Sequence, residues 1–194
     1  MSRPADDTPI RLAVIVASTR EGRFGPTVAA WFVEHASQRG DLEIDVVDLA
    51  DFDVPSRYGP TGDPAMAPFR ERIGFADAFV VVTPEYNHGY PAVLKQAIDF
   101  VRAEWQAKPV GFVSYGGISG GLRAVEQLRL VFAELHAVTI RDGVSLHFGW
   151  NLFDDAGAMH EPESPVLAAK TMLEELTWFA RALRTARAEH PYGS

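Results

Sequence analysis

The stretch "VVVTPEYNHGYPAVLKQAIDF", residues 80–100, changes from one kind of secondary structure to another. It begins as a continuous apolar run, which predicts a strand buried on both faces. It then turns through PEYNHG and resumes with a helical pattern after Pro91, a residue that favours the first turn of a helix. We therefore expect a strand at 77–83, a helix at 91–103, and a loop between them at the carboxyl end of the strand.

The same alternation of apolar run and helical pattern recurs along the chain. Further strands are expected at residues 11–17, 43–49, 108–115 and 138–146. Further helices are expected at 26–38, 66–75, 121–137 and 163–189, with a long proline-rich loop at 51–68. Right-handed crossovers place the helices on both faces of such a sheet. The chain therefore predicts an α/β three-layer sandwich around a five-stranded parallel sheet in strand order 2-1-3-4-5.

The composition indicates one globular domain over residues 1–194. Of the 194 residues, 47% are apolar and 23% are charged, and the net charge of −8 argues against binding to nucleic acid or an anionic membrane. No apolar run approaches the roughly 20 residues that span a bilayer. The absence of cysteine excludes disulfides and fits a cytoplasmic protein. Residues 1–9 are polar, without the apolar core of a signal peptide, and are expected to be flexible.

Three loops of unusual composition follow strands of the predicted sheet: loop one (18–26), loop two (84–90) and loop three (114–120). Parallel sheets bind ligands outside the carboxyl ends of their strands, where the strand order reverses. Tight turns between strand and helix also collect Gly, Pro and Ser for purely structural reasons. Three such loops at one edge nevertheless favour a ligand site.

Loop one lies in the segment ASTREGRFGPT, residues 17–27, directly before a predicted helix. Backbone N–H groups and the helix dipole favour an anion at such a position. Ser18 and Thr27 offer hydroxyl groups, and Arg20 or Arg23 offers a guanidinium for phosphate oxygens. The glycine patterns that bind pyrophosphate are absent, so a terminal monophosphate is favoured. The alternative is a solvated surface loop with two ordinary arginines.

Loop two contains Pro84, which is expected to end the preceding strand because it lacks an N–H group. The backbone groups of Glu85, Tyr86 and Asn87 would then remain unpaired, and the edge of a planar heterocycle could pair with them. Alternatively, Asn87 bonds its own backbone in a self-capping turn, and Tyr86 only packs. His88 is a candidate contact to substrate at the pocket mouth, with a surface histidine as the alternative.

Loop three belongs to the segment SYGGISGG, residues 114–121. Its four glycines allow the backbone to approach a flat group closely. Ser114 and Ser119 could cap the helix that follows. A long capped turn without a ligand is the alternative.

Three motifs give the chain a family resemblance: S-x-R-x-G at Ser18, P-E-Y-N-x-x-x-P-x-x-L-K-x-A-I-D from Pro84 to Asp99, and K-P-V followed by Ser-Tyr-Gly-Gly. With them the chain resembles the NAD(P)H-dependent FMN reductases, flavodoxin-like enzymes that include quinone, azo and chromate reductases. The resemblance extends over residues 11 to about 150. It implies a single flavodoxin-like domain that binds FMN without a covalent bond at the carboxyl edge of the sheet.

The resemblance also implies where the cofactor binds. The phosphate would lie at loop one and the start of the next helix, with the isoalloxazine ring between loops two and three. Relatives often carry Ser and then Asn where this chain has Arg23 and Gly25, which leaves open which arginine contacts phosphate. The implied cofactor-binding residues are Ser18, Arg20, Arg23, Phe24, Gly25, Pro26, Thr27, Pro84, Glu85, Tyr86, Asn87, Ser114, Tyr115, Gly116 and Gly117.

The implied activity is hydride transfer from NAD(P)H to flavin N5 and onward to flavin, a quinone or a similar small-molecule acceptor. The flavin itself carries this chemistry, so no catalytic side chain is expected. No metal site is expected, since the histidines lack ligand spacing. An exposed apolar surface over Tyr90 to Trp105, with the 51–68 loop, predicts a homodimer or homotetramer.

Two other functions stay open at this point. A flavodoxin-type electron carrier would bind FMN without oxidising NAD(P)H. A non-enzymatic flavin or redox sensor would need a specific partner. The preferred nicotinamide and the physiological acceptor are left open as well.

Overall fold

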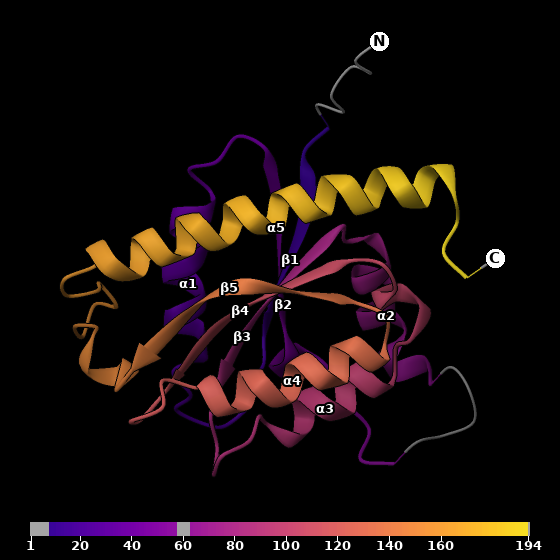
Figure 1. The fold of residues 1–194 in the computed structure, drawn as a ribbon. Helices are drawn as coiled ribbons and strands as arrows, with labels where there is room; N and C mark the ends of the chain where they lie inside the picture. The colour runs from indigo at the N-terminus through magenta and orange to yellow at the C-terminus, as the bar shows by residue number, and fades with distance from the viewer. Residues whose placement is uncertain (1–7, 58–62, 194) are drawn as a thin grey trace.

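The computed structural model describes residues 8–57 and 63–193, and it contains one five-stranded sheet (Figure 1). Every pair of neighbouring strands is parallel, and the order β2-β1-β3-β4-β5 confirms the predicted topology. The strands are β1 (Ile10–Val16), β2 (Leu42–Asp48), β3 (Ala78–Pro84), β4 (Pro109–Gly116) and β5 (Val138–His147).

Helices cover both faces of this sheet, which confirms the three-layer prediction. Helices α1 and α5 pack on one face, and α2, α3 and α4 on the other; in Figure 1, α5 lies above the strands and α3 and α4 lie below them. The helices are α1 (Gly25–Ala36), α2 (Ala67–Phe75), α3 (Ala92–Asp99), α4 (Leu122–Glu134) and α5 (Glu163–Glu189). Short 3₁₀ turns are η1 (Leu49–Asp51), η2 (Pro64–Met66), η3 (Ala103–Trp105) and η4 (Gly149–Asn151).

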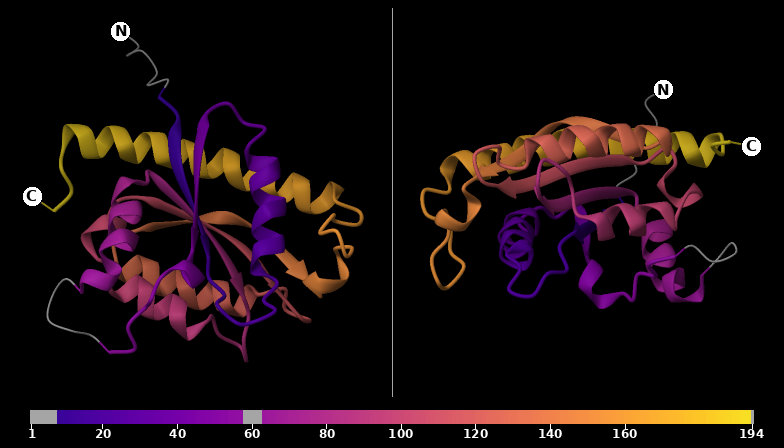
Figure 2. Two further views of the ribbon diagram at one scale, coloured as in Figure 1. Left: turned by 180° about the vertical axis from the view of Figure 1, so that it is seen from behind. Right: turned by 90° about the horizontal axis from the view of Figure 1, so that it is seen from below.

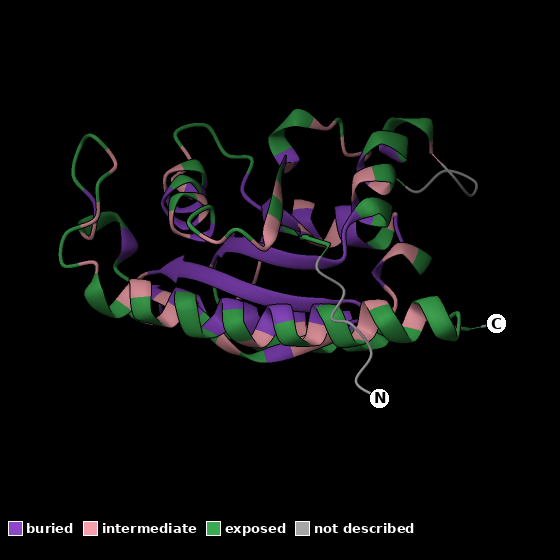
Figure 3. Cartoon of the chain, turned by 90° about the horizontal axis from the view of Figure 1, so that it is seen from above, coloured by how far each residue is buried: buried purple, intermediate pink, exposed green. Residues whose placement is uncertain are grey.

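The central strands are buried on both sides because their side chains alternate between two cores. In β1, Leu12 and Val14 face α1 and α5, whereas Ala13 and Ile15 face the opposite helices, and all four are at most 1% exposed. Figure 3 shows the buried strands between the helical layers, with α5 exposed along its outer side. Burial on both faces explains why these strands read as continuous apolar runs.

Three expectations need correction. The helix expected at 91–103 ends at Asp99, where the buried indole of Trp105 donates a hydrogen bond of 3.2 Å to the carbonyl of Ile98. The loop expected to extend to residue 68 is shorter, because a 3₁₀ turn begins at Pro64. The side chains between residues 90 and 105 do not form an exposed apolar surface, since Leu94, Ile98 and Trp105 are at most 1% exposed.

Parts of two expectations fall outside the described chain, namely a flexible start at residues 1–7 and the loop at residues 58–62. Within the described residues, no helix combines the length and the apolar character needed to cross a membrane.

Candidate functional site

A pocket of about 430 Å³ lies at the carboxyl ends of β1, β3 and β4, where the strand order reverses. Its volume is within the range of roughly 300–1,000 Å³ typical of small-molecule sites. The three loops that the sequence singled out meet here. The lining residues are Arg20, Glu21, Gly22, Arg23, Phe24, Pro84, Glu85, Tyr86, Tyr115, Gly116, Gly117 and Trp150.

The two arginines of loop one have different environments. Arg23 forms a two-pronged ion pair with Asp48 at the end of β2, at 2.5 and 2.6 Å, and also donates to the carbonyl of Ser18 at 2.6 Å. Arg20 makes no ion pair within the described residues, and its guanidinium carbon lies 4.6 Å from the centre of the Tyr86 ring. Arg23 therefore holds loop one against β2, whereas the guanidinium of Arg20 is not committed to an ion pair within the described residues and lines the pocket together with Glu21.

The start of α1 is packed tightly against two buried hydroxyl groups. Ser18 is fully buried, and its oxygen accepts a hydrogen bond of 3.3 Å from the hydroxyl of Tyr115. A Cβ atom at Gly25 would lie 2.4 Å from the Ser18 oxygen, so only glycine fits there. Phe24 packs edge-on against Tyr115 with ring centres 5.8 Å apart. The glycine thus brings the amino end of α1 against the wall of the pocket.

Tyr115 holds its proton at neutral pH. Burial raises the pKa of its hydroxyl to about 12, although the hydrogen bond with Ser18 acts in the opposite direction. The hydroxyl is therefore a hydrogen-bond donor inside the site and unsuited to proton transfer near neutral pH.

Loop two forms a tight turn that closes on itself. The amide of Tyr86 donates to the carbonyl of Gly89 at 2.8 Å, and the amide of Gly89 returns a bond of 3.0 Å. Asn87 and His88 between them have φ angles of +50° and +69°, as a type I′ turn requires. The amide of Glu85 donates to the carbonyl of Tyr115 at 3.0 Å, so the pairing between β3 and β4 continues past Pro84. The expectation that the amides of Glu85 and Tyr86 are unpaired is therefore wrong.

The carboxylate of Glu85 serves the amino end of α4. It accepts hydrogen bonds from the amide of Arg123 at 3.1 Å and from its guanidinium at 3.0 Å. Burial alone would raise the pKa of Glu85, but hydrogen bonds from Ser119 and Arg123 outweigh burial and lower the pKa. The N-cap residue of α4 is Gly121, which offers no side chain. Glu85 therefore supplies an acceptor that the helix lacks, a role that sequence analysis did not foresee.

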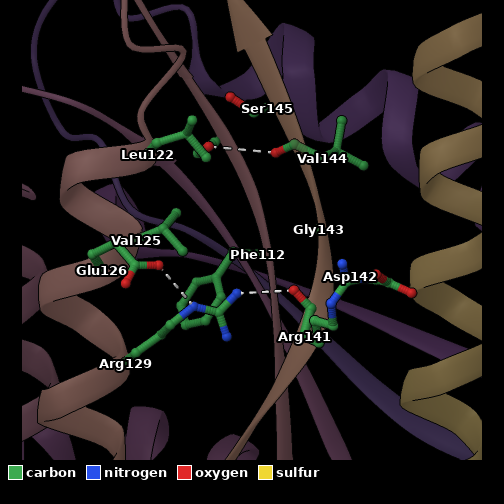
Figure 4. A pocket seen from close by; sticks show the side chains of 11 residues that line it. Phe112, Leu122, Val125, Glu126, Arg129, Arg141, Asp142, Gly143, Val144 and Ser145 are labelled. Atoms are coloured by element: carbon green, nitrogen blue, oxygen red, sulfur yellow. Dashed lines mark hydrogen bonds and ion pairs between the residues drawn. The ribbon is translucent and has the colours of Figure 1, made fainter.

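Ser114 faces away from the candidate site. Its hydroxyl donates to the carbonyl of Gly120 at 2.8 Å, and the side chain borders a separate hollow of about 310 Å³. Figure 4 shows this hollow between α4 and β5, with Leu122, Val125 and Val144 among its labelled residues. In that hollow, Arg129 donates to the carbonyls of Ile140 and Arg141, so its polar groups are paired within the protein. Neither Ser114 nor Ser119, the two candidate caps, is the N-cap residue of α4, which is Gly121. The hydroxyl of Ser119 accepts a long bond of 3.4 Å from the amide of Gly121.

The glycines of loop three fall into two pairs with different structural roles. Gly120 and Gly121 have φ angles of +59° and +89°, and a Cβ atom on either would come within 2.6 Å of a neighbouring side chain. Both are therefore required by the conformation of the loop itself. At Gly117 the nearest neighbour of a Cβ atom would be Trp150, at 3.8 Å. Gly116 and Gly117 present backbone to the pocket, as the sequence predicted for this loop.

The pocket contains nine of the predicted site residues. Seven others lie outside its lining: Ser18, Gly25, Pro26, Thr27, Asn87, His88 and Ser114. The first four are in or beside the first turn of α1, next to the pocket. The carbonyl of His88 accepts a bond of 2.6 Å from Gln127, which anchors the turn to α4. The structure does not bring His88 to the lining.

Sequence analysis missed the wall that follows β5. Trp150 lines the pocket from η4, and beyond it the segment 152–160 passes the end of the sheet beside α1 (orange in Figure 2). A Cβ atom at Gly157 would lie 3.5 Å from the methyl group of Thr27. The signal that could have found this wall is topological, because β5 neighbours β4 and residues after both strands reach the same edge.

The described residues contain no group of three histidine or carboxylate side chains placed to hold a metal ion. What the pocket does offer suits a phosphorylated planar ring. Arg20 and the amino end of α1 provide positive potential for a phosphate. Tyr86 and the backbone of Gly116 and Gly117 provide surface for a flat group.

Comparison with known proteins identifies the family. Residues 10–151 match the family described as NADPH-dependent FMN reductase, and the chain belongs to that family. An NAD(P)H-dependent FMN reductase from Schizosaccharomyces pombe is 39% identical over 121 residues, which cover 57% of this chain and 60% of that protein. A quinone reductase from Pseudomonas putida is 32% identical over 171 residues, covering 81% of this chain and 89% of that protein. The match to the first relative thus spans less than two thirds of its length.

Solved structures support the fold. The flavoenzyme NAD(P)H:(acceptor) oxidoreductase FerB from Paracoccus denitrificans superposes with a TM-score of 0.72 at 20% identity. The superposition covers 88% of this chain and 97% of FerB. The flavodoxin-like architecture predicted from the sequence is confirmed.

Proposed function

We propose that this protein is an NAD(P)H-dependent FMN reductase that binds FMN in the 430 Å³ pocket and reduces flavin, quinone or similar small acceptors. The observation that carries the proposal is the convergence of three loops and the amino end of α1 on one pocket at the switch point of the sheet. The family of the chain and the names of its relatives point to the same activity.

Loop one and α1 would hold the phosphate of FMN. Arg20 supplies the charge, because Arg23 is already paired with Asp48. Arg20 now lies over the ring of Tyr86. A dianionic phosphate offers the guanidinium stronger hydrogen bonds than an aromatic ring does. FMN binding is therefore expected to draw Arg20 away from Tyr86.

Loops two and three would hold the isoalloxazine ring. Gly116 and Gly117 allow close approach of their backbone to a flat group, and Tyr86 offers an aromatic surface. Bound FMN supplies the redox chemistry by taking hydride from the reduced nicotinamide and passing electrons to the acceptor. The protein residues position these molecules and exclude water from them.

The protonation states in the pocket support a role for its side chains in binding and positioning, with the redox chemistry left to FMN. Tyr115 stays protonated because burial raises its pKa to about 12. Glu85 stays ionised, since hydrogen bonds from Ser119 and Arg123 overcome the effect of burial and lower its pKa. Neither group is therefore poised to transfer a proton near neutral pH.

Titration of the purified apoprotein with FMN, followed by NAD(P)H oxidation with a quinone, tests the proposal. Saturable binding at one FMN per chain and rapid reduction of the bound flavin by NAD(P)H are expected. FMN binding without NAD(P)H oxidation would favour the electron carrier instead, and no binding would refute the proposal.

The proposal extends to assembly and location. Ile118, Leu122 and Leu130 are 74%, 48% and 75% exposed on loop three and α4, and a second subunit could cover them. A homodimer or homotetramer is therefore proposed. A cytoplasmic location is proposed separately, from the absence of cysteine. Sedimentation at micromolar protein concentration should give at least twice the monomer mass, and a monomer throughout would contradict this part.

A further inference from the structure

Two aromatic side chains follow β5, and the proposed binding of FMN assigns them no role: Trp150 lines the pocket, and Phe148 packs against Trp150. Phe148 is 47% exposed and Trp150 is 54% exposed. Their rings meet edge to face with centres 6.2 Å apart. Trp150 lines the pocket beside Gly117. Large apolar rings that remain exposed next to a ligand pocket are typical of a surface that a ligand covers.

The backbone fixes this pair in place. Phe148 has a φ angle of +47°, a left-handed conformation that is rare and unfavourable for a bulky residue. Its amide donates to the carbonyl of Gly117 at 3.1 Å, and its carbonyl accepts from Asn151 at 2.8 Å. A Cβ atom on the buried Gly149 would lie 3.2 Å from Tyr115. An exposed aromatic residue held in this unfavourable conformation, in contact with the pocket-lining Trp150, points to a functional constraint.

The chemistry of this surface is that of stacking. Phe148 offers no polar group, and Trp150 offers only its indole N–H. The neighbouring Gly117 has no side chain to cover the indole. A flat aromatic molecule that enters beside Gly117 would meet a ring edge or face, whereas a compact hydrated anion would gain nothing.

We propose that Phe148 and Trp150 form a stacking surface for planar aromatic electron acceptors of the quinone class. This inference rests on the proposed function, because it assigns the acceptor to the same pocket. Aromatic contacts contribute about 0.5–1.5 kcal/mol beyond burial of area, and 1.4 kcal/mol is about tenfold in affinity. Removing the indole is therefore expected to weaken acceptor binding by about tenfold.

Trp150→Ala and Trp150→Phe test the inference, with Trp178→Ala as the matched control. Trp178 is 66% exposed and also packs edge-on against a phenylalanine, but it lies on α5 and does not line the pocket. The measured quantity is the Kd of 1,4-naphthoquinone for the oxidised FMN-loaded protein without NAD(P)H, read from the flavin absorbance. Binding is thus measured without turnover.

We expect the naphthoquinone Kd to rise about tenfold in Trp150→Ala, to recover to within about threefold in Trp150→Phe, and to stay unchanged in Trp178→Ala. The Kd of FMN and the rate of ferricyanide reduction should not change in Trp178→Ala, which lies outside the pocket. In Trp150→Ala, the Kd of naphthoquinone should rise by more than the Kd of FMN does. Circular dichroism of each variant checks the fold.

An unchanged naphthoquinone Kd in Trp150→Ala would overturn the inference. A parallel loss of FMN affinity would overturn it too, because Trp150 would then belong to the wall of the cofactor site. Failure of the unaltered protein to bind any FMN is a different result, seen before any variant is compared, and it would overturn the proposed function together with this inference.

Discussion

Glu85 is predicted to hold loop two against α4 through its carboxylate, and Glu85→Ala tests this role. The carboxylate is 7% exposed and accepts two hydrogen bonds from Arg123, one from the backbone amide and one from the guanidinium. The alanine variant leaves the amino end of α4 without its acceptor and loop two without its tie to the helix. Both the free energy of unfolding and the affinity for FMN should fall.

The expected loss of stability is about 2 kcal/mol. A lost N-cap acceptor costs about 0.5–2 kcal/mol, and a hydrogen bond to a charged group contributes about 1.5–3 kcal/mol. The guanidinium of Arg123 is 44% exposed and can be rehydrated, which keeps the total near the lower end of the summed ranges. Glu85→Gln keeps an acceptor for the amide but loses the charge, so it should cost about half as much.

Urea denaturation of the apoprotein measures the stability, and flavin fluorescence measures the FMN affinity. Glu126→Ala is the control, because Glu126 lies on the same helix, is 75% exposed, and pairs with Arg129 at 3.3 Å. An exposed pair of this kind contributes about 0–1 kcal/mol. The reasoning is refuted if Glu85→Ala unfolds at the same urea concentration as the unaltered protein yet no longer binds FMN, since the carboxylate would then act on the ligand.

Three further predictions follow from single contacts. Gly25→Ala forces a methyl group to within 2.4 Å of the Ser18 oxygen, so it should destabilise the protein by about 1–3 kcal/mol in urea, whereas Gly40→Ala, with open space around it, should not. The pKa of the buried Lys108 is lowered by burial to about 8, so between about pH 8 and 10.5 the unfolded chain binds the extra proton. Stability should therefore rise with pH across that window by up to about 3 kcal/mol, and Lys108→Met should flatten the rise in urea titrations. Arg20→Ala should weaken FMN binding about tenfold but leave riboflavin binding unchanged, because only FMN has a phosphate; an equal loss for both flavins would contradict this role.

The fold could be predicted because its three central strands, β1, β3 and β4, are buried on both faces. A run such as residues 79–82 packs against helices on either side, so almost every position is apolar. The alternation of apolar and polar residues that marks a half-exposed strand is therefore absent. Because these strand runs alternate with helical patterns along the chain, few sheet topologies are compatible with the sequence. The ends of the helices were less predictable. Helix α3, for example, ends at Asp99, where the indole of Trp105 donates a hydrogen bond to the carbonyl of Ile98.

The position of the pocket at the carboxyl edge of the sheet could be predicted from the strand order, but the partners of its side chains could not. Arg23 pairs with Asp48, 25 residues away, and Glu85 pairs with Arg123, 38 residues away. No local pattern encodes such pairs, because they depend on which loops the sheet brings together. Trp150 was missed because it follows the edge strand β5, where no loop of unusual composition drew notice.

The central claim is that FMN binds at the carboxyl edge of this sheet, and a crystal structure of the protein with FMN tests it most directly. The account predicts the phosphate at Arg20 and the amino end of α1, with the ring beside Tyr86 and Gly117. FMN bound elsewhere, for example in the hollow between α4 and β5, or an empty pocket at saturating FMN, would contradict the account.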